Sequence, residues 1–121
     1  MEMIGVLIGS EDPKRLVDFY TKLFGDPAFD ENGYTGWGSA AGWITIGPHD
    51  QVKGTNAEPG RLIWGTMSND VHGDFERFAA AGATVVREPY DPSGQDGSNA
   101  LIATFADPDG NYFQLMSPMD M

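Results

Sequence analysis

The residues of this chain that could carry out nucleophilic or acid–base chemistry are few and far apart. The chain has 121 residues, with two histidines and no cysteine, which excludes thiolate nucleophiles, disulfides and thiolate metal sites. His49 follows a predicted strand, where the adjacent Asp50 could orient its imidazole. His72 falls in the first turn of a predicted helix, a position that is usually solvated. Nothing in the spacing brings the histidines together, so His49 is kept as a candidate polar residue and no catalytic residue is assigned.

One further polar side chain stands on a segment that is otherwise built for burial. The last predicted strand, Tyr112 to Met116, follows an Asp-Pro-Asp-Gly-Asn turn. Strand alternation places Gln114 on one face with Tyr112 and Met116, and the apolar Phe113 and Leu115 on the other. Gln114 is therefore either a functional group or an edge residue.

The charge of the chain limits its partners. Seven basic and eighteen acidic residues give a net charge of −11, which argues against nucleic acid because phosphate binding needs clustered Lys and Arg. A cationic ligand would be attracted, although scattered acidic residues also serve solubility alone. No run of about 18 apolar residues predicts a membrane span, and the start of the chain lacks a basic leader. We therefore expect a cytoplasmic protein with no membrane partner.

The elements that must position these residues occur twice along the chain. The first half predicts a strand over 3–9, a helix with its N-cap at Asp12 and its end at Gly25, and short strands over 28–30, 34–38 and 42–47. The apolar residues of that helix fall on one face: Leu16, Phe19, Tyr20, Leu23 and Phe24.

The second half repeats this order after a polar, turn-rich segment over 48–60. It predicts a strand over 62–67, a helix from Asp70 to Gly82, strands over 84–86, 101–105 and 112–116, and a loop over 89–98. Each half reads βαβββ, with modules at about 1–57 and 58–121 of a single domain. The predicted fold is α+β, with a helix covering one face of each sheet.

Three segments resemble the vicinal-oxygen-chelate superfamily, which includes glyoxalase I, bleomycin-resistance proteins and extradiol dioxygenases. These segments are residues 12–25, 79–86 and 105–115, and with the doubled βαβββ pattern they cover nearly the whole chain. The resemblance implies curled sheets that form a cavity, with the helices on the outer faces. It also implies that the cavity lies within one chain or between exchanged modules of two chains, and that the protein is a homodimer.

The resemblance further implies where metal ligands would stand. Members that use a metal carry His, Gln or Glu on the first strand of each module and Glu or Gln on the last. The matching positions here hold Gly5, Thr45 or Ile46, Ile63 or Leu62, and Gln114. Gln114 alone could act as a ligand, and one amide oxygen is a poor site for a transition metal. We therefore expect no metal and no cofactor.

Large rings are numerous for so short a chain and suggest a pocket. Trp43 shares strand parity with Thr45, while Ile44 and Ile46 face the other way and suit the helix-packed side. By family analogy the candidate ligand-binding residues are Trp37, Trp43, Thr45, Trp64, Tyr90, Tyr112, Gln114 and Met116. Alternatively, these rings belong to the core or to a subunit interface. A shift of one residue in the strand over 62–67 would move Trp64 between cavity and core.

Three functions remain open. The favoured hypothesis is a glyoxalase/bleomycin-resistance-like protein that binds a small aromatic or cationic molecule in a metal-free cavity. The first alternative is a lyase-, isomerase- or dioxygenase-like enzyme of the same superfamily, for which the proposed cavity lacks a clear general base. The second is a dimeric interaction domain whose rings form the subunit interface.

Overall fold

Two compact units make up the chain, Met1–Thr55 and Asn56–Met121. The computed structural model describes residues 1–39, 42–92 and 100–118. Residues 40 and 41, which separate two predicted strands, and residues 93–98 of the predicted loop lie outside the described residues. In the described part of the chain, no helix is long and apolar enough to cross a membrane.

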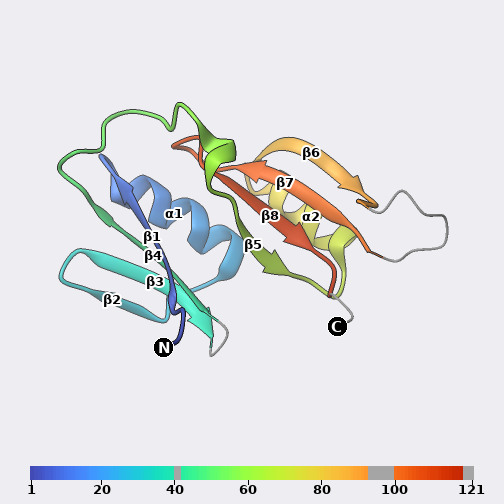
Figure 1. Cartoon of the computed structure of the whole chain (residues 1–121), viewed down its shortest axis with the longest axis horizontal. Coiled ribbons are helices and arrows are strands. Elements are labelled where there is room, and N and C mark those ends of the chain that lie inside the picture. The colour runs from blue at the N-terminus through green and yellow to red at the C-terminus, as the bar shows by residue number, and fades with distance from the viewer. Residues whose placement is uncertain (40–41, 93–99, 119–121) are drawn as a thin grey trace. The chain divides into compact units, whose positions relative to one another are not determined.

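The first module is a four-stranded sheet with one helix (Figure 1). Its elements are β1 (Gly5–Ser10), α1 (Pro13–Phe24), β2 (Phe29–Glu31), β3 (Tyr34–Ser39) and β4 (Gly42–Pro48). The strand order is β1-β4-β3-β2. β1 is parallel to β4 because α1 carries the chain back across the sheet, and the other pairs are antiparallel.

The second module repeats this arrangement. After a 3₁₀ turn (Pro59–Arg61) come β5 (Trp64–Met67), α2 (Val71–Ala80), β6 (Thr84–Tyr90), β7 (Ile102–Ala106) and β8 (Tyr112–Met116). The strand order is β5-β8-β7-β6, with β5 parallel to β8 and the other pairs antiparallel. The predicted α+β fold with two βαβββ modules is confirmed.

Both helices begin at the predicted aspartates. The carboxylate of Asp12 accepts a hydrogen bond from the backbone N–H of Arg15 at 3.4 Å, and Pro13 occupies the first turn. The carboxylate of Asp70 accepts from the backbone N–H of Gly73 at 3.1 Å. Each bond satisfies a donor that would otherwise lack an intrahelical partner.

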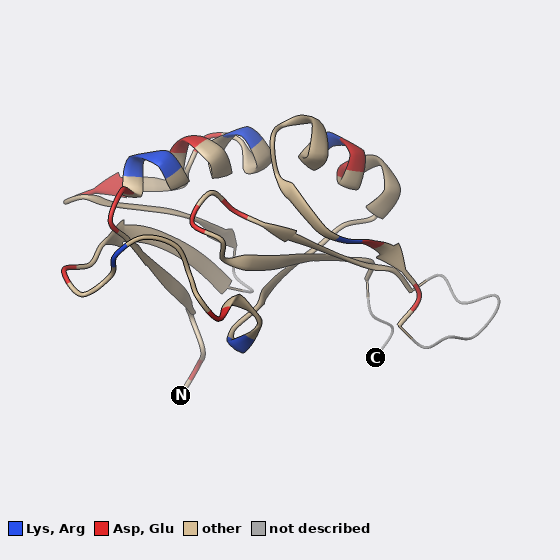
Figure 2. Cartoon of the chain, turned by 90° about the horizontal axis from the view of Figure 1, so that it is seen from above, with Lys and Arg blue, Asp and Glu red and all other residues tan. Residues whose placement is uncertain are grey.

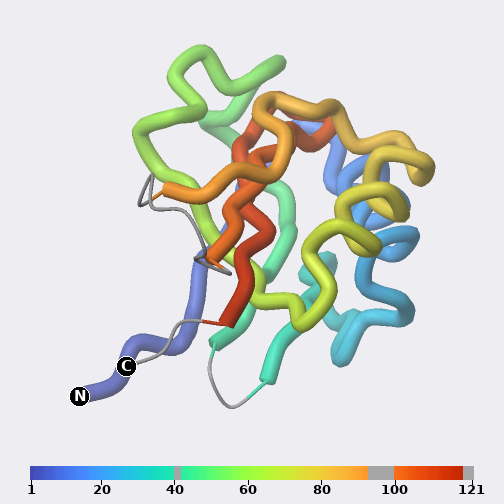
Figure 3. The backbone as a smooth tube through the Cα atoms, turned by 90° about the vertical axis from the view of Figure 1, so that its right-hand side faces the viewer, coloured from blue at the N-terminus to red at the C-terminus, as the bar shows by residue number. Residues whose placement is uncertain are grey.

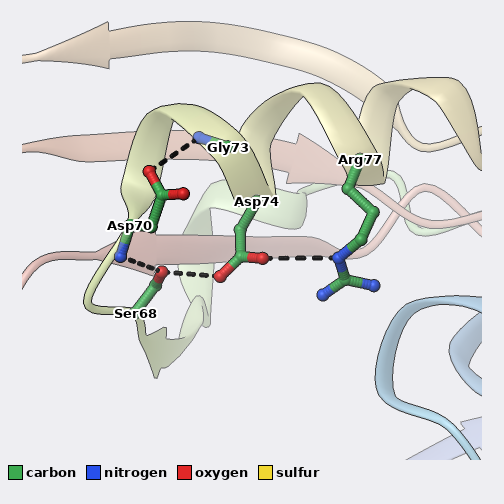
Figure 4. A network of polar contacts seen from close by, with 5 residues as sticks. All are labelled: Ser68, Asp70, Gly73, Asp74 and Arg77. Atoms are coloured by element: carbon green, nitrogen blue, oxygen red, sulfur yellow. Dashed lines mark hydrogen bonds and ion pairs between the residues drawn. The ribbon is translucent and has the colours of Figure 1, made fainter.

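A polar network reinforces the start of α2 (Figure 4). The hydroxyl of Ser68 accepts from the backbone N–H of Asp70 at 2.9 Å and donates to the carboxylate of Asp74 at 2.6 Å. Asp74 also accepts from Arg77 at 3.3 Å. A carboxylate in the first turn is stabilised by the positive end of the helix dipole. This network therefore fixes where the helix starts.

In each module the helix lies against its own sheet (Figure 3), and the core is buried between the helix and one face of that sheet. In the first module α1 contributes Leu16, Phe19, Tyr20 and Leu23. In the second, Phe78 of α2 lies 5.6 Å from the ring of Phe105 and 6.4 Å from that of Phe113. The opposite face of each sheet, which its helix does not cover, is named here the helix-free face.

The largest difference from a predicted boundary is at the end of β6, whereas β1 and β5 begin two residues later than predicted. The loop expected from Pro89 is strand as far as Tyr90, and β6 therefore runs for seven residues. Proline lacks a backbone donor and is tolerated on edge strands, and β6 is the edge of its sheet. Two irregularities in its pairing with β7, between Val85 and Arg87 and between Arg87 and Tyr90, let the strand continue.

Candidate ligand-binding faces

The helix-free face of the first module is aromatic and apolar. Because paired residues of neighbouring strands share a face, the register Leu7↔Thr45 places Leu7 beside Thr45. Trp43 lies on the same face two residues earlier and is 37% exposed. The predicted parity is confirmed for this strand, since Ile46 is fully buried on the opposite face.

Two rings on this face lie on glycines. Gly36 pairs with Phe29, and a Cβ at Gly36 would collide with the Phe29 ring. A Cβ at Gly47 would collide with the ring of Tyr34 in the same way. Phe29 also packs against Trp43, with ring centroids 5.7 Å apart. Glycine thus lets the rings lie against the backbone and gives the first module a layer of aromatic surface.

The helix-free face of the second module carries Gln114, and polar groups lie beside it. The register Thr104↔Gln114 aligns these residues across β7 and β8. The side-chain amide of Gln114 donates to the hydroxyl of Thr104 at 3.4 Å. Tyr112 and Met116 share the face, as predicted from alternation, and both are partly buried. Gln114 is therefore not an edge residue, because β8 lies inside the sheet.

Two of the predicted site tryptophans lie on the helix side of their sheets. Trp37 is 7% exposed, pairs with Ile44 and donates from its indole Nε1 to the carbonyl of Gly25 at 2.9 Å. Trp64 is 9% exposed and stacks on Phe113 with ring centroids 5.1 Å apart. The register Trp64↔Phe113 resolves the ambiguity of this strand in favour of the core. Trp37 and Trp64, which were among the candidate ligand-binding residues, therefore lie in the cores of their modules.

The remaining predicted ring, Tyr90, lies at the end of β6 and pairs with Ile102. Since Ile102 also pairs with Met116, Tyr90 belongs to the same helix-free face as Gln114. The register brings together Tyr90, Tyr112, Gln114 and Met116 within the second module, and Trp43 and Thr45 within the first.

His49 sits in a local turn after β4. Its Nδ1 accepts from the backbone N–H of Gln51 at 3.2 Å and lies 3.8 Å from a carboxylate oxygen of Asp50. The Asp50 side chain is almost fully exposed, so the pair is a surface contact. His72 is exposed on α2. His49 lies at the end of the helix-free face of the first module, where a Cβ at Gly9 would meet its side chain at 2.8 Å.

The donor groups at the family's ligand positions do not fit a transition metal. Gly5 lies on β1, and a Cβ there would collide with the backbone carbonyl of Trp43. On the parallel strands β1 and β5, the neighbours of Thr45 and Gln114 are Leu7 and Gly65, which supply no ligand atom. On the other side Gln114 has the neutral hydroxyl of Thr104. Across the described ranges, no three His, Asp or Glu residues lie close enough to hold an ion. Each module offers neutral oxygens alone at these positions, whereas transition metals favour imidazole and carboxylate.

Sequence reasoning missed Arg87 and Thr104. Thr104 was hidden because it belongs to a short apolar strand, and it is 7% exposed. Arg87 lay beyond the predicted end of its strand. The signal that could have found it is its charge, because the other Lys and Arg residues of the chain are on helices or loops.

Comparisons with known proteins agree with this architecture. The sequence profile of the family described as "Glyoxalase-like domain" matches residues 5–116. The chain belongs to this glyoxalase-like family. No curated protein matches the chain.

Solved structures share the fold at low identity. A glyoxalase-related enzyme from Fulvimarina pelagi is 20% identical with a TM-score of 0.73, over 97% of this chain and 88% of that one. A glyoxalase/bleomycin resistance protein/dioxygenase family enzyme from Burkholderia phytofirmans PsJN is 18% identical with a TM-score of 0.73, over 98% and 100%. A glyoxalase/bleomycin resistance protein from Albidiferax ferrireducens T118 is 20% identical with a TM-score of 0.74, over 95% and 97%.

These neighbours agree with the vicinal-oxygen-chelate fold and, at such identities, say nothing about the activity of this glyoxalase-like chain. Its own side chains must supply that argument.

Proposed function

We propose that this glyoxalase-like protein binds a small aromatic molecule, without a metal, on the helix-free faces of its modules. The observation that carries the proposal is the Gln114–Thr104 pair, a hydrogen-bonded polar group on a strand face among Tyr112 and Met116. Ligand sites combine apolar and aromatic walls with a few polar groups that fix orientation. The poor donor set described above supports the metal-free part of the proposal.

Exposed apolar surface on the first module supports the same function. Trp43 and Tyr34 are 37% and 39% exposed beside Leu7, which is 58% exposed. Rings held on glycine present flat surfaces on which an aromatic ligand could stack. The net charge of −11 favours a cationic ligand, because the negative field would attract the cation and the rings would form cation–π contacts with it.

Titration with 2-naphthol, a neutral aromatic alcohol, tests the proposal. Gln114→Ala should weaken binding about threefold to tenfold, the effect of about 1 kcal/mol expected for one hydrogen bond. Gln51→Ala, which removes the same side chain from an exposed loop, should leave binding unchanged. The effect of Trp43→Leu on binding of 2-naphthol tests the helix-free face of the first module separately. Equal affinity of Gln114→Ala and the parent protein would refute the role of Gln114.

We also propose that the protein forms a homodimer. The supporting observation is exposed apolar surface on the edge strand β5, where Met67 is 69% exposed, and just before it, where Leu62 is 68% exposed. Such edges are usually protected by charge or by a partner. Light scattering after size exclusion should give twice the chain mass of 13.1 kDa, and Met67→Lys should lower it. A monomer at micromolar concentration contradicts this part.

A further inference from the structure

Several Lys and Arg side chains of this acidic chain are paired with nearby carboxylates. Among the described residues, ion pairs with carboxylates include Lys14 with Asp18, Lys53 with Glu11, Arg61 with Glu58, and Arg77 with Asp74. The hydrogen bond and charge of Asp18 raise the pKa of Lys14. Figure 2 shows these charges on helices and loops, and a basic segment on strand β6.

That basic residue of β6 is Arg87, and its contact is different in kind. Its guanidinium carbon lies 3.5 Å from the centroid of the Tyr90 ring. Within the described ranges it forms no ion pair. Stacking on a ring orients the guanidinium and leaves its N–H groups free to bind elsewhere.

Two bulges bring Arg87 and Tyr90 to the same face. Val85 pairs with Phe105, which is fully buried on the helix side. Strict alternation would place Arg87 with Val85, but the first register shift pairs it with Thr104 on the helix-free face. The second shift pairs Tyr90 with Ile102 and turns this ring to the same face. Bulges re-aim side chains in this way next to functional sites.

The register then aligns three polar side chains across three strands. Arg87 pairs with Thr104, and Thr104 pairs with Gln114. We call Arg87, Thr104 and Gln114 the donor row. It is flanked on one side by Ile102 and Met116, which pair with each other two residues further along their strands.

The donor row offers mainly hydrogen-bond donors, although the amide oxygen of Gln114 can also accept. The guanidinium has N–H donors and no acceptor. The Thr104 hydroxyl accepts from Gln114, so its own proton is available to a ligand, and the Gln114 amide keeps a second N–H. A group that only accepts hydrogen bonds matches this set, and an oxyanion is such a group. An ammonium group has no acceptor to offer and would be repelled by Arg87, so at this face the nearby charge opposes the cationic ligand that the net charge favours.

We infer that the ligand of this protein is an aromatic molecule bearing an oxyanion, a carboxylate or a phosphate, which the donor row binds. The inference rests on the proposed function and specifies its ligand class. The net charge of −11 repels anions at long range, so the selectivity comes from the close contacts of Arg87. The ring of the ligand lies against the apolar residues that flank the donor row.

Three aromatic probes of one shape test this inference: 2-naphthoate, neutral 2-naphthol and the cationic 2-naphthyl-trimethylammonium, titrated by calorimetry at pH 7 in low salt. The parent protein should bind 2-naphthoate at least tenfold more tightly than either other probe. A fourth titration uses 2-naphthyl phosphate. Tighter binding of this probe than of 2-naphthoate indicates a phosphate ligand, and weaker binding indicates a carboxylate ligand.

Arg87→Gln should abolish the preference for 2-naphthoate, and Thr104→Val should reduce it about threefold. Arg77→Gln is the matched control, because Arg77 also lies over a ring, that of Phe78 at 4.8 Å, but belongs to α2. This control should keep the full preference. Circular dichroism of each variant verifies folding.

The outcomes separate this inference from the function on which it rests. If all probes bind equally and Gln114→Ala weakens them all, binding at this face stands and the oxyanion inference is wrong. A preference for 2-naphthoate that survives Arg87→Gln, or a preference for the cation, also overturns it. If no probe binds, the proposed function and the inference both fail.

Discussion

The two modules share one architecture, but their helix-free faces differ in chemistry. Ser10 and Ser68 both accept a hydrogen bond from the backbone N–H of the N-cap aspartate, at 3.0 and 2.9 Å. Beyond this shared start, the first module covers its helix-free face with rings on glycines, whereas the second carries the donor row.

Different residues therefore specify the βαβββ fold and the chemistry of the helix-free face. Caps, turns and helix-side apolar residues fix the βαβββ unit, so they recur in both halves. Side chains on the helix-free face support little of the core and are free to differ. Function is therefore to be sought where the modules diverge.

The largest expected loss of stability tests whether the cores of the two modules are alike. Trp37→Ala and Trp64→Ala should each lower the free energy of unfolding by about 3–5 kcal/mol, as for buried aromatic residues in general. Trp43→Ala should cost about 1 kcal/mol, because Trp43 is partly exposed. Urea denaturation followed by circular dichroism measures all three. A cost for Trp43→Ala equal to that of Trp37→Ala would contradict the division into core and helix-free face.

An intermediate effect tests how differently the faces are packed. Gly36→Ala should cost about 1–3 kcal/mol, because the new Cβ meets the rigid ring of Phe29. Gly65→Ala should stay within about 0.5 kcal/mol, because its Cβ meets the flexible end of Met116 at 2.6 Å.

The double variant Phe29→Leu with Gly36→Ala identifies the cause of that cost. The substitutions should be non-additive, with the alanine costing less once the ring is gone. Additive costs, measured in the same urea series, would show that the glycine is needed for another reason.

The smallest expected effect concerns the helix starts. Asp12→Ala and Asp70→Ala should each cost about 1 kcal/mol, the usual loss of an N-cap. Ser68→Ala should exceed this in the second module, because it also removes the 2.6 Å bond to Asp74. Thermal unfolding compares the three variants. If Ser68→Ala costs less than Asp70→Ala, the network in Figure 4 adds nothing to the cap.

Much of the fold could be predicted because its signals are local. Asp12 and Asp70 cap helices through bonds to residues three positions on. The last strand was predicted with the bounds observed, Tyr112–Met116, because a turn and strict alternation define it. The candidate site could be predicted in part, since Gln114 and Trp43 lie on the faces that parity assigns them.

The sequence by itself determined the doubled βαβββ order, the helix caps and which residues stand at the family's ligand positions. Tertiary structure decided which face each remaining residue occupies, because that depends on strand pairing rather than on neighbours in the chain. Trp64 is in the core because it pairs with Phe113. Arg87 joins Gln114 because a bulge in β6 reverses the alternation after Val85, and periodicity alone does not indicate where a strand will bulge.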